Sequence, residues 1–199
     1  MHQKIIFVNG FLFPGTYPGG EGYWQGAGSA FVKAAHDYLG CGLSPHFTDI
    51  QHPVLSNVSE RIQKGRLYTT QHYSSLTTGL SKEQDQFTFV THSMGAAFAE
   101  GMITCLQDNG YHIGAVIHFN AFQAADIQIS KNNSRNGFVI DYQNTNDPLI
   151  NNPVYARAGD IKNVDLKIRE QSKKHYFKRH RDPIDSGDVW QILMRYTKP

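Results

Sequence analysis

Ser93 is the residue of this chain whose type and setting most clearly suggest chemistry. It lies in the segment Val-Thr-His-Ser-Met-Gly at residues 90–95 and is the only serine with a glycine two positions later. A serine hydroxyl becomes a nucleophile when a nearby base removes its proton, and such serines occupy sharp strand-to-helix turns. The turn strains the serine backbone and needs small neighbours, here Gly95 and Ala96. We therefore expect Ser93 to be a catalytic nucleophile, with helix capping as its alternative role.

The turn at Ser93 requires a strand before it and a helix after it, and the hydrophobic pattern predicts both. Residues 87–91 form an apolar run rich in β-branched and aromatic side chains. After the serine, apolar and small residues recur at three- and four-residue steps, as on one face of a helix. These residues are Met94, Ala97, Phe98, Gly101, Met102 and Cys105. The pair Asn109-Gly110 then ends the predicted helix.

Similar runs predict the rest of a sheet. Strands are expected at residues 5–8, 87–91, 115–119, 138–142 and 164–168, with 45–50 as the candidate for a sixth. Several runs are continuously apolar, which favours strands buried on both faces of a parallel sheet. Helical patterns lie between them, including one that begins at the capping-box pair Asn57 and Glu60 and runs to Leu80, with Gly65 weakening its middle. We therefore predict an α/β fold with a doubly wound, mostly parallel sheet and helices on both faces, whose active residues follow strands directly.

Length and composition fit one soluble domain. A chain of 199 residues with 40% hydrophobic and 18% charged residues can bury a core of its own. The net charge of +2 gives no reason to expect nucleic acid as a partner. The two cysteines, Cys41 and Cys105, exclude a disulfide-stapled scaffold, and we expect two free thiols, with a single bridge as the alternative.

Targeting segments are not expected in this sequence. The first apolar run, at residues 5–8, is too short for the core of a secretory signal peptide. No run approaches the roughly 18 apolar residues that a transmembrane helix needs. The compartment stays open: the chain is cytoplasmic by default and secreted if it is a domain excised from a larger effector.

Two motifs together resemble the α/β-hydrolase superfamily. Thr-His-Ser-Met-Gly at residues 91–95 and Val-Asn-Gly-Phe at residues 8–11 each follow a predicted strand, as in a small lipase or esterase. The resemblance spans nearly the whole chain and implies a single α/β-hydrolase domain over residues 1–199. Thr91 is the main local departure, because the usual motif has glycine there.

The resemblance also implies an oxyanion hole, which is a pair of N–H groups that stabilise the negative oxygen formed during acyl transfer. In the family these donors are the residue after the nucleophile and a residue after an early strand. Carried over, they are the backbone N–H groups of Met94 and Phe11. Gly10 would permit close approach of a substrate, although it also suits an ordinary turn after a strand.

The family's chain order of serine, acid and histidine implies an acid after Ser93. Asp147 follows the strand expected at 138–142 in a loop that resembles the family's acid loop, although Asp-Pro also starts ordinary turns. Asp141 and Asp126 are weaker candidates. Asp141 would point away from the loop, and Asp126 lies far upstream.

The same order implies a base late in the chain, which leaves His180 and His175. His180 precedes a turn and the final helix expected around Trp190, where the family usually has its catalytic histidine. We therefore prefer His180, with His175 as the fallback. His92 is expected to pack rather than act as the base, because its side chain leaves the strand opposite to that of Ser93.

Two further segments border this expected site. In the long loop at residues 11–28, Leu12, Phe13, Tyr23 and Trp24 are expected to line an acyl pocket, with packing onto the domain as an equal alternative. Residues 173–181 carry the strongest local excess of positive charge. These cations could attract anionic lipid headgroups or give transient contact with a membrane surface, with a solvated basic loop as the alternative.

No cofactor is expected. The sequence has neither a His-Glu-x-x-His pattern nor a Gly-x-x-x-x-Gly-Lys phosphate loop, and its scattered histidines suit structural or solvated positions better than metal ligation.

The leading hypothesis is a lipase- or carboxylesterase-like serine hydrolase that cleaves small-molecule or lipid esters through an acyl-enzyme on Ser93. A non-catalytic binding module on the same fold is the second hypothesis. A third arises from the segments at residues 142–148 and 179–187, which look similar to small hydrolase domains at the C-termini of bacterial repeat-containing secreted proteins. That resemblance implies a phospholipase-type antibacterial toxin countered by an immunity protein.

Overall fold

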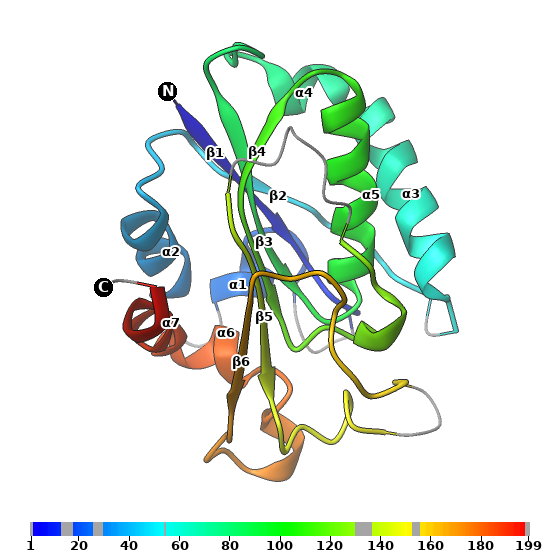
Figure 1. The fold of residues 1–199 in the computed structure, drawn as a ribbon, viewed down its shortest axis with the longest axis vertical. Helices are drawn as coiled ribbons and strands as arrows, with labels where there is room; N and C mark the ends of the chain where they lie inside the picture. Colours follow the sequence, from blue (N-terminus) through cyan, green and yellow to red (C-terminus); the bar gives the residue numbers. More distant parts are fainter. Residues whose placement is uncertain are drawn as a thin grey trace.

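Six parallel strands form the centre of the computed structural model, which describes residues 2–12, 18–25, 30–53, 55–129, 137–152 and 156–197 (Figure 1). The strands are β1 (Gln3–Val8), β2 (His46–Phe47), β3 (Gln86–His92), β4 (His112–Phe119), β5 (Val139–Asn144) and β6 (Leu166–Glu170). Their order across the sheet is β2-β1-β3-β4-β5-β6, and all neighbouring pairs are parallel. The predicted α/β fold with a doubly wound parallel sheet is confirmed.

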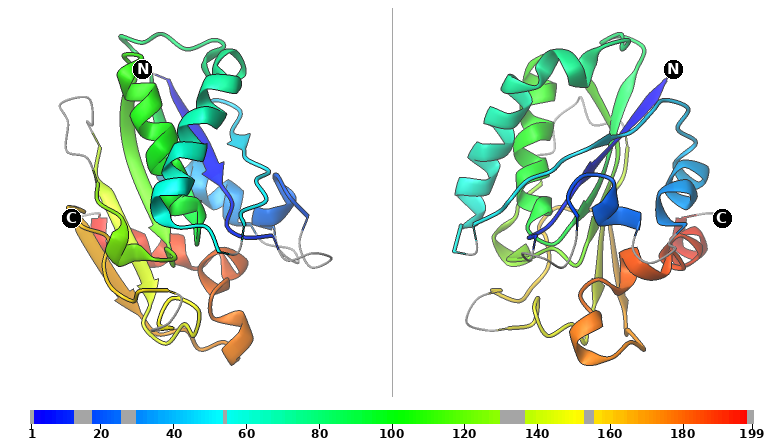
Figure 2. Two further views of the ribbon diagram at one scale, coloured as in Figure 1. Left: turned by 90° about the vertical axis from the view of Figure 1, so that its right-hand side faces the viewer. Right: turned by 180° about the vertical axis from the view of Figure 1, so that it is seen from behind.

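Helices cover both faces of the sheet (Figures 1 and 2). One face packs against α3 (Val58–Gln71), α4 (Tyr73–Thr77) and α5 (Gly95–Asp108). The other packs against α1 (Gly22–Gln25), α2 (Phe31–Leu39), α6 (Asp182–Ser186) and α7 (Val189–Thr197). Side chains alternate between the two layers along β1: Ile6 and Val8 join the first, whereas Ile5 and Phe7 join the second. β1, β3, β4 and β5 are therefore largely buried on both faces, as their apolar character predicts, whereas the edge strands β2 and β6 are only partly buried.

The order of the strands reverses at β1. From β1 the chain passes through α2 to β2 at the edge of the sheet, then crosses the opposite face through α3 and α4 to β3. β1 thus lies between β2 and β3, and the carboxyl ends of β1 and β3 lie side by side, with Val8 opposite Thr91. In sheets of this kind ligands bind at such a reversal point.

Most strand boundaries differ from the sequence prediction by one to three residues, as where β4 begins at His112 and β6 spans Leu166–Glu170, and two elements differ more. The strand expected at 45–50 is limited to His46–Phe47, and directly after it the Thr48 hydroxyl and the Ile50 N–H donate to the side chain of Asn9. The helix expected from Asn57 to Leu80 begins at the predicted capping box but ends at Gln71, and α4 follows after His72. Short 3-10 turns, η1 (Ala124–Asp126) and η2 (Tyr176–Lys178), lie in the loops after β4 and β6.

Both cysteines are free thiols, as expected. Cys105 is buried, and burial raises the pKa of the half-buried Cys41 to about 11, so that this thiol stays protonated at neutral pH. None of the helices in the described part of the chain combines the length and hydrophobicity needed to cross a bilayer.

Helices α3 and α5 are in direct backbone contact at two glycines. A Cβ atom added to Gly65 would lie 1.9 Å from the backbone oxygen of Phe98, and one added to Gly101 would lie 1.9 Å from that of Ile62. Backbone atoms of two packed helices cannot move aside as a side chain can. Gly65, which lowers the helix propensity of α3, is therefore required by the packing on α5.

Gly101→Ala should destabilise the fold by roughly 1–3 kcal/mol, because overpacking outweighs the better helix propensity of alanine. Chemical denaturation would measure the change. The matched control is Gly42→Ala, since no atom lies within 4 Å of a Cβ added at Gly42. A Gly101→Ala protein as stable as the Gly42→Ala protein would contradict this account of the helix contact.

Candidate active site

Ser93 occupies the strained turn that the sequence predicts. It lies between β3 and α5 with a φ of 55°, a left-handed conformation that non-glycine residues adopt rarely and at a cost of about 1–3 kcal/mol. Its N–H donates to the carbonyl of Phe119 over 3.0 Å, and its carbonyl accepts from the N–H groups of Ala96 and Phe122 over 3.2 Å each. These bonds hold the turn in place against its strain.

Close contact with the loop after β1 explains the small residues around Ser93. A Cβ on Gly95 would lie 2.4 Å from the carbonyl oxygen of Val8, and a Cβ on Gly10 would lie 2.7 Å from both Ser93 Cβ and the Tyr23 hydroxyl. The two glycines thus let the loop pack directly on the serine turn. Gly10 serves this close approach rather than an ordinary turn.

Asn9 fixes the backbone that leads into Gly10. Its buried side-chain oxygen accepts from the Thr48 hydroxyl over 2.7 Å and from the Ile50 N–H over 3.1 Å. Its amide nitrogen donates to the carbonyls of Ile50 and Gly10 over 2.8 Å each. His52 Nε2–H donates to the Asn9 carbonyl over 3.0 Å. Sequence patterns gave no signal for Asn9, Thr48 or His52 beyond the Asn-Gly pair itself.

The two residues expected to form an oxyanion hole lie on either side of this contact. Met94 is the cap of α5, and none of the hydrogen bonds among the described residues uses its backbone N–H. This N–H is one of the unpaired donors at the positive end of the helix dipole. Phe11 follows Gly10 and is half-buried. Their joint role as oxyanion donors stays a prediction.

The structure brings Asp147 and His180 together. His180 Nδ1 lies 2.7 Å from Asp147 Oδ2, and the other carboxylate oxygen accepts from the Leu149 N–H over 2.9 Å. Asp147 is fully buried, whereas the His180 side chain is 12% exposed. With Nδ1–H donated to the carboxylate, the neutral ring presents Nε2 as a proton acceptor. His175, the fallback, lies exposed before η2.

Side chains from the ends of three adjacent strands hold the backbone at His180. His92 Nε2–H and Asn120 Nδ2 both donate to the His180 carbonyl, over 2.9 and 2.8 Å, and Asn144 Nδ2 donates to the Arg179 carbonyl over 2.9 Å. Asn120 Oδ1 in turn accepts from the Asn144 N–H over 2.7 Å. We call these three side chains the clasp. Sequence reasoning missed both asparagines, because nothing in their local pattern separates them from ordinary loop residues.

The clasp places His180 beside the serine turn. The His180 ring centroid lies 4.6 Å from that of His92, the residue directly before Ser93. None of the hydrogen bonds among the described residues joins the Ser93 hydroxyl to His180. In sites without substrate such bonds are often long and tighten when substrate binds.

His92 serves this arrangement as a neutral donor. Because a carbonyl oxygen only accepts, His92 Nε2 carries the proton toward His180, and Nδ1 accepts from the Tyr23 hydroxyl over 2.6 Å. Burial lowers the pKa of His92 well below its ordinary value and raises that of Tyr23 to about 12. Arg181 lies 4.5 Å above the Tyr23 ring and donates to the Tyr23 carbonyl over 2.7 Å. Tyr23 thus links the clasp to the helix that follows His180.

Thr91, the departure from the usual motif, has a partner on the next strand. Its hydroxyl lies 2.8 Å from His118 Nδ1 on β4, and His118 Nε2 lies 3.6 Å from Glu100 Oε1 on α5. All three side chains are buried. A glycine two residues before the serine could not make this contact, so threonine here connects β3 to β4 directly below the turn.

The expectation that Tyr23 and Trp24 contact a substrate does not fit their burial. Trp24 is 0% and Tyr23 2% exposed, and the Trp24 ring stacks on Phe31 with centroids 5.6 Å apart. Both residues pack α1 onto the sheet, which was the alternative to substrate contact. Leu12 is half-buried, and its carbonyl accepts from Gln51 Nε2 over 3.1 Å. Phe13 lies outside the described residues.

The weaker acid candidates lie in other interactions. Asp141 is fully buried and pairs with Arg169 of β6 over 2.6 Å, while Asp126 pairs with Arg157 over 3.3 Å. In the described part of the chain, no group of three or more His, Cys, Asp or Glu side chains could hold a metal ion.

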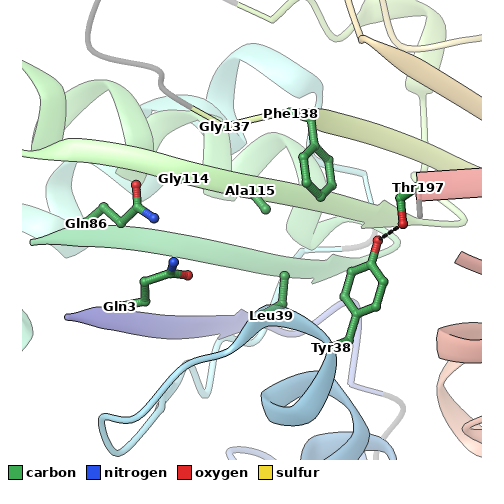
Figure 3. Close-up of a pocket in the computed structure, with 9 residues that line it drawn as sticks. All are labelled: Gln3, Tyr38, Leu39, Gln86, Gly114, Ala115, Gly137, Phe138 and Thr197. Atoms are coloured by element: carbon green, nitrogen blue, oxygen red, sulfur yellow. Dashed lines mark hydrogen bonds between the residues drawn. The ribbon is translucent and has the colours of Figure 1, made fainter. Parts of the chain in front are cut away.

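A cavity of about 380 Å³ lies at the opposite end of the sheet (Figure 3). Gln3 and Gln86, the first residues of β1 and β3, point into it beside Gly114 of β4, and the Tyr38 hydroxyl meets Thr197 Oγ1 at 2.7 Å on its border. The cavity contains none of the residues expected to act in catalysis. The cavity lies near the amino ends of β1 and β3, whereas Ser93 lies at the carboxyl end of β3.

Comparison with models of protein families and with curated proteins finds no match to this chain. The resemblance to the α/β-hydrolases rests on the sequence motifs at Ser93 and Gly10.

Because some histidines are buried in the neutral form, we expect the folded protein to lose stability in acid. His52 is fully buried with no partner for Nδ1 among the described residues, and burial lowers its pKa from 6.5 to about 4. The unfolded chain therefore binds a proton between these values while the folded chain does not. The contribution of neutral His52 to the free energy of unfolding is complete above pH 6.5. It is lost as the pH falls toward 4, and the loss from this residue is about 2 kcal/mol at pH 5.

Urea unfolding at about pH 7 and pH 5 would measure this decline. His52→Gln keeps an amide donor toward the Asn9 carbonyl but removes the titrating ring, so its stability should fall less over the same interval. Replacement of the exposed His175 by glutamine is the control, and this variant should lose as much stability between the two pH values as the unmodified protein. Equal declines in all three proteins would show that His52 is not responsible.

Proposed function

We propose that the protein is a serine hydrolase that cleaves carboxylic esters, of small molecules or lipids, through an acyl-enzyme on Ser93. The observation that carries the proposal is that two features meet at the carboxyl ends of the strands. One is the strained serine turn between β3 and α5, and the other is the buried carboxylate of Asp147 bonded to His180. Neither feature is needed to stabilise a parallel sheet, and the turn imposes a cost on it.

In the proposed reaction His180 Nε2 takes the proton of the Ser93 hydroxyl while Ser93 Oγ attacks the ester carbonyl carbon. Asp147 stabilises the resulting imidazolium through the bond to Nδ1–H, and its own proton state does not change. When the tetrahedral intermediate collapses, His180 returns the proton to the departing alcohol. Water then attacks the acyl-enzyme, with His180 again as base, and releases the acid.

Negative charge develops on the carbonyl oxygen during both attacks. The N–H of Met94 at the first turn of α5 and that of Phe11 are the proposed donors, and each such donor contributes about 3 kcal/mol to transition-state stability in serine hydrolases. The contact between Gly10 and Ser93 supports this assignment, because it brings the loop with Phe11 against the serine turn.

A fluorophosphonate probe tests the proposal, since it phosphonylates an activated serine. The folded protein should be labelled, and Ser93→Ala should remove the label without changing the circular dichroism spectrum. His180→Ala should slow labelling and ester hydrolysis by a thousandfold or more, because the serine then lacks its base.

His175→Ala is the matched control and should react like the unmodified protein. Absence of labelling in folded protein would favour the non-catalytic binding module instead. Loss of labelling in His175→Ala with retention in His180→Ala would assign the base to His175.

Because the clasp positions His180, changing it should alter the rate of ester hydrolysis. His92→Leu removes one donor to the His180 carbonyl and should lower kcat by about 10- to 100-fold with little change in KM, as expected for a misplaced catalytic group. His92→Gln supplies an amide N–H near the position of Nε2 and should recover part of the loss. A His92→Leu enzyme with unchanged kcat would show that Asn120 and Asn144 are sufficient to hold His180.

A further inference from the structure

We infer that one exposed surface beside the site docks the protein onto anionic lipid. We call this surface the basic rim and define it as Lys173, Lys174, Tyr176 and Lys178 with Leu149 from the adjoining loop. Docking deepens the proposed function by naming the surface from which substrate is taken. The effect of docking on turnover rests on the proposed function. Docking itself does not, because binding to lipid needs no nucleophile.

Positive charge in the basic rim is not neutralised within the described part of the chain. Residues 171–181 contain five Lys or Arg and no Asp or Glu. Lys173, Lys174 and Lys178 are exposed, and no hydrogen bond or ion pair among the described residues engages their ammonium groups. By contrast, exposed Lys33 and Lys167 pair with Asp37 and Asp160. The rim therefore presents three free cations within six residues.

Nearby carboxylates are directed to other partners. Asp182 accepts from the Ser172 hydroxyl, and Glu170 accepts from the Tyr196 hydroxyl over 3.2 Å. Asp147 is fully buried against His180. No ion pair joins any of these carboxylates to a rim lysine in the described part of the chain, so the three ammonium groups are exposed to solvent without a paired charge.

The basic rim is held next to the candidate site. Ser172 and Asn146 exchange two hydrogen bonds of 2.8 and 3.0 Å, and Arg179 donates to the carbonyls of Lys174 and Asn146. These bonds fix the segment to the loop that carries Asp147, and the segment ends at His180. In Figure 1 it forms the lower end of the molecule, beyond the carboxyl ends of β5 and β6. A surface bound there would face the site.

Apolar side chains favour a lipid surface over a nucleic acid. Tyr176 is 51% and Leu149 43% exposed, and they lie on the two loops that the rim joins. Exposed apolar groups next to lysines suit the boundary between headgroups and acyl chains. Nucleic-acid binding would instead need cations spread along a groove, and the net charge of the whole chain is only +2.

The expected strength follows from the number of lysines. Each lysine near an anionic membrane surface strengthens binding roughly fivefold, so three together contribute on the order of a hundredfold. The attraction should weaken as salt shortens the Debye length. Docking of this strength is reversible, which suits an enzyme that must leave the surface.

The experiment measures cosedimentation of Ser93→Ala protein with vesicles of phosphatidylglycerol and phosphatidylcholine. Replacement of Lys173, Lys174 and Lys178 by glutamine should reduce binding on the order of a hundredfold. The matched control replaces exposed Lys33, Lys64 and Lys82 by glutamine, which changes the net charge equally and should retain binding. Neither protein should bind vesicles of phosphatidylcholine alone with comparable strength.

Equal loss of binding in both triple variants would overturn the inference, because it would assign the attraction to net charge. Binding to a DNA duplex without binding to the vesicles would replace lipid by nucleic acid as the partner. With Ser93 restored, the rim variant should hydrolyse a soluble neutral ester at the unmodified rate. Vesicle binding without fluorophosphonate labelling would support docking and contradict the proposed hydrolase. Labelling together with vesicle binding that does not depend on the rim lysines would support the hydrolase and contradict docking by the rim.

Discussion

The arrangement of the candidate site depends on the close contact between the loop after β1 and the turn after β3. Val8 and Thr91 are opposite each other in neighbouring parallel strands, so the chain leaves both strands at the same level of the sheet. Only glycine at positions 10 and 95 allows the two segments to meet there without collision. The contact brings the backbone at Phe11 to the start of α5, beside Ser93 with its positive φ. Larger residues at either glycine would separate these segments before they affected any other part of the fold.

Buried polar side chains at the ends of the strands do the remaining positioning. Asn9 holds the loop after β1, whereas His92, Asn120 and Asn144 hold the backbone at His180. A buried polar group is costly unless it is bonded. Asn120 and Asn144 bond each other, whereas His92 bonds Tyr23 and Asn9 bonds the loop after β2. Satisfied networks of this kind are rigid, because moving one member leaves another without a partner. The carboxyl ends of β3, β4 and β5 are therefore ordered by the same bonds that place the candidate base.

Local sequence patterns predicted much of this structure. The capping box at Asn57 and Glu60, the helix after Ser93 and the parallel sheet all follow from spacing within a few residues. The pairing of Asp147 with His180 was expected from resemblance alone, since the two residues are 33 positions apart. The clasp asparagines and the partner of Thr91 had no local signal, because their bonds join positions that only the folded sheet brings together. For the same reason, aromatic content alone could not separate buried Trp24 from a residue that lines a pocket.

The contact between Arg181 and Tyr23 joins residues 158 positions apart. Beside it, Trp190 of α7 packs on Phe31 of α2, with ring centroids 5.1 Å apart. Chains are synthesised from the N-terminus, and contacts of high sequence separation form late and slowly. The Ser93 turn and the strands around it can therefore assemble on a nascent chain well before α6 and α7 exist. His180, the proposed base, would reach its position beside Ser93 only when these last helices pack over α1 and α2. On the growing chain the serine turn would therefore form before His180 is in place.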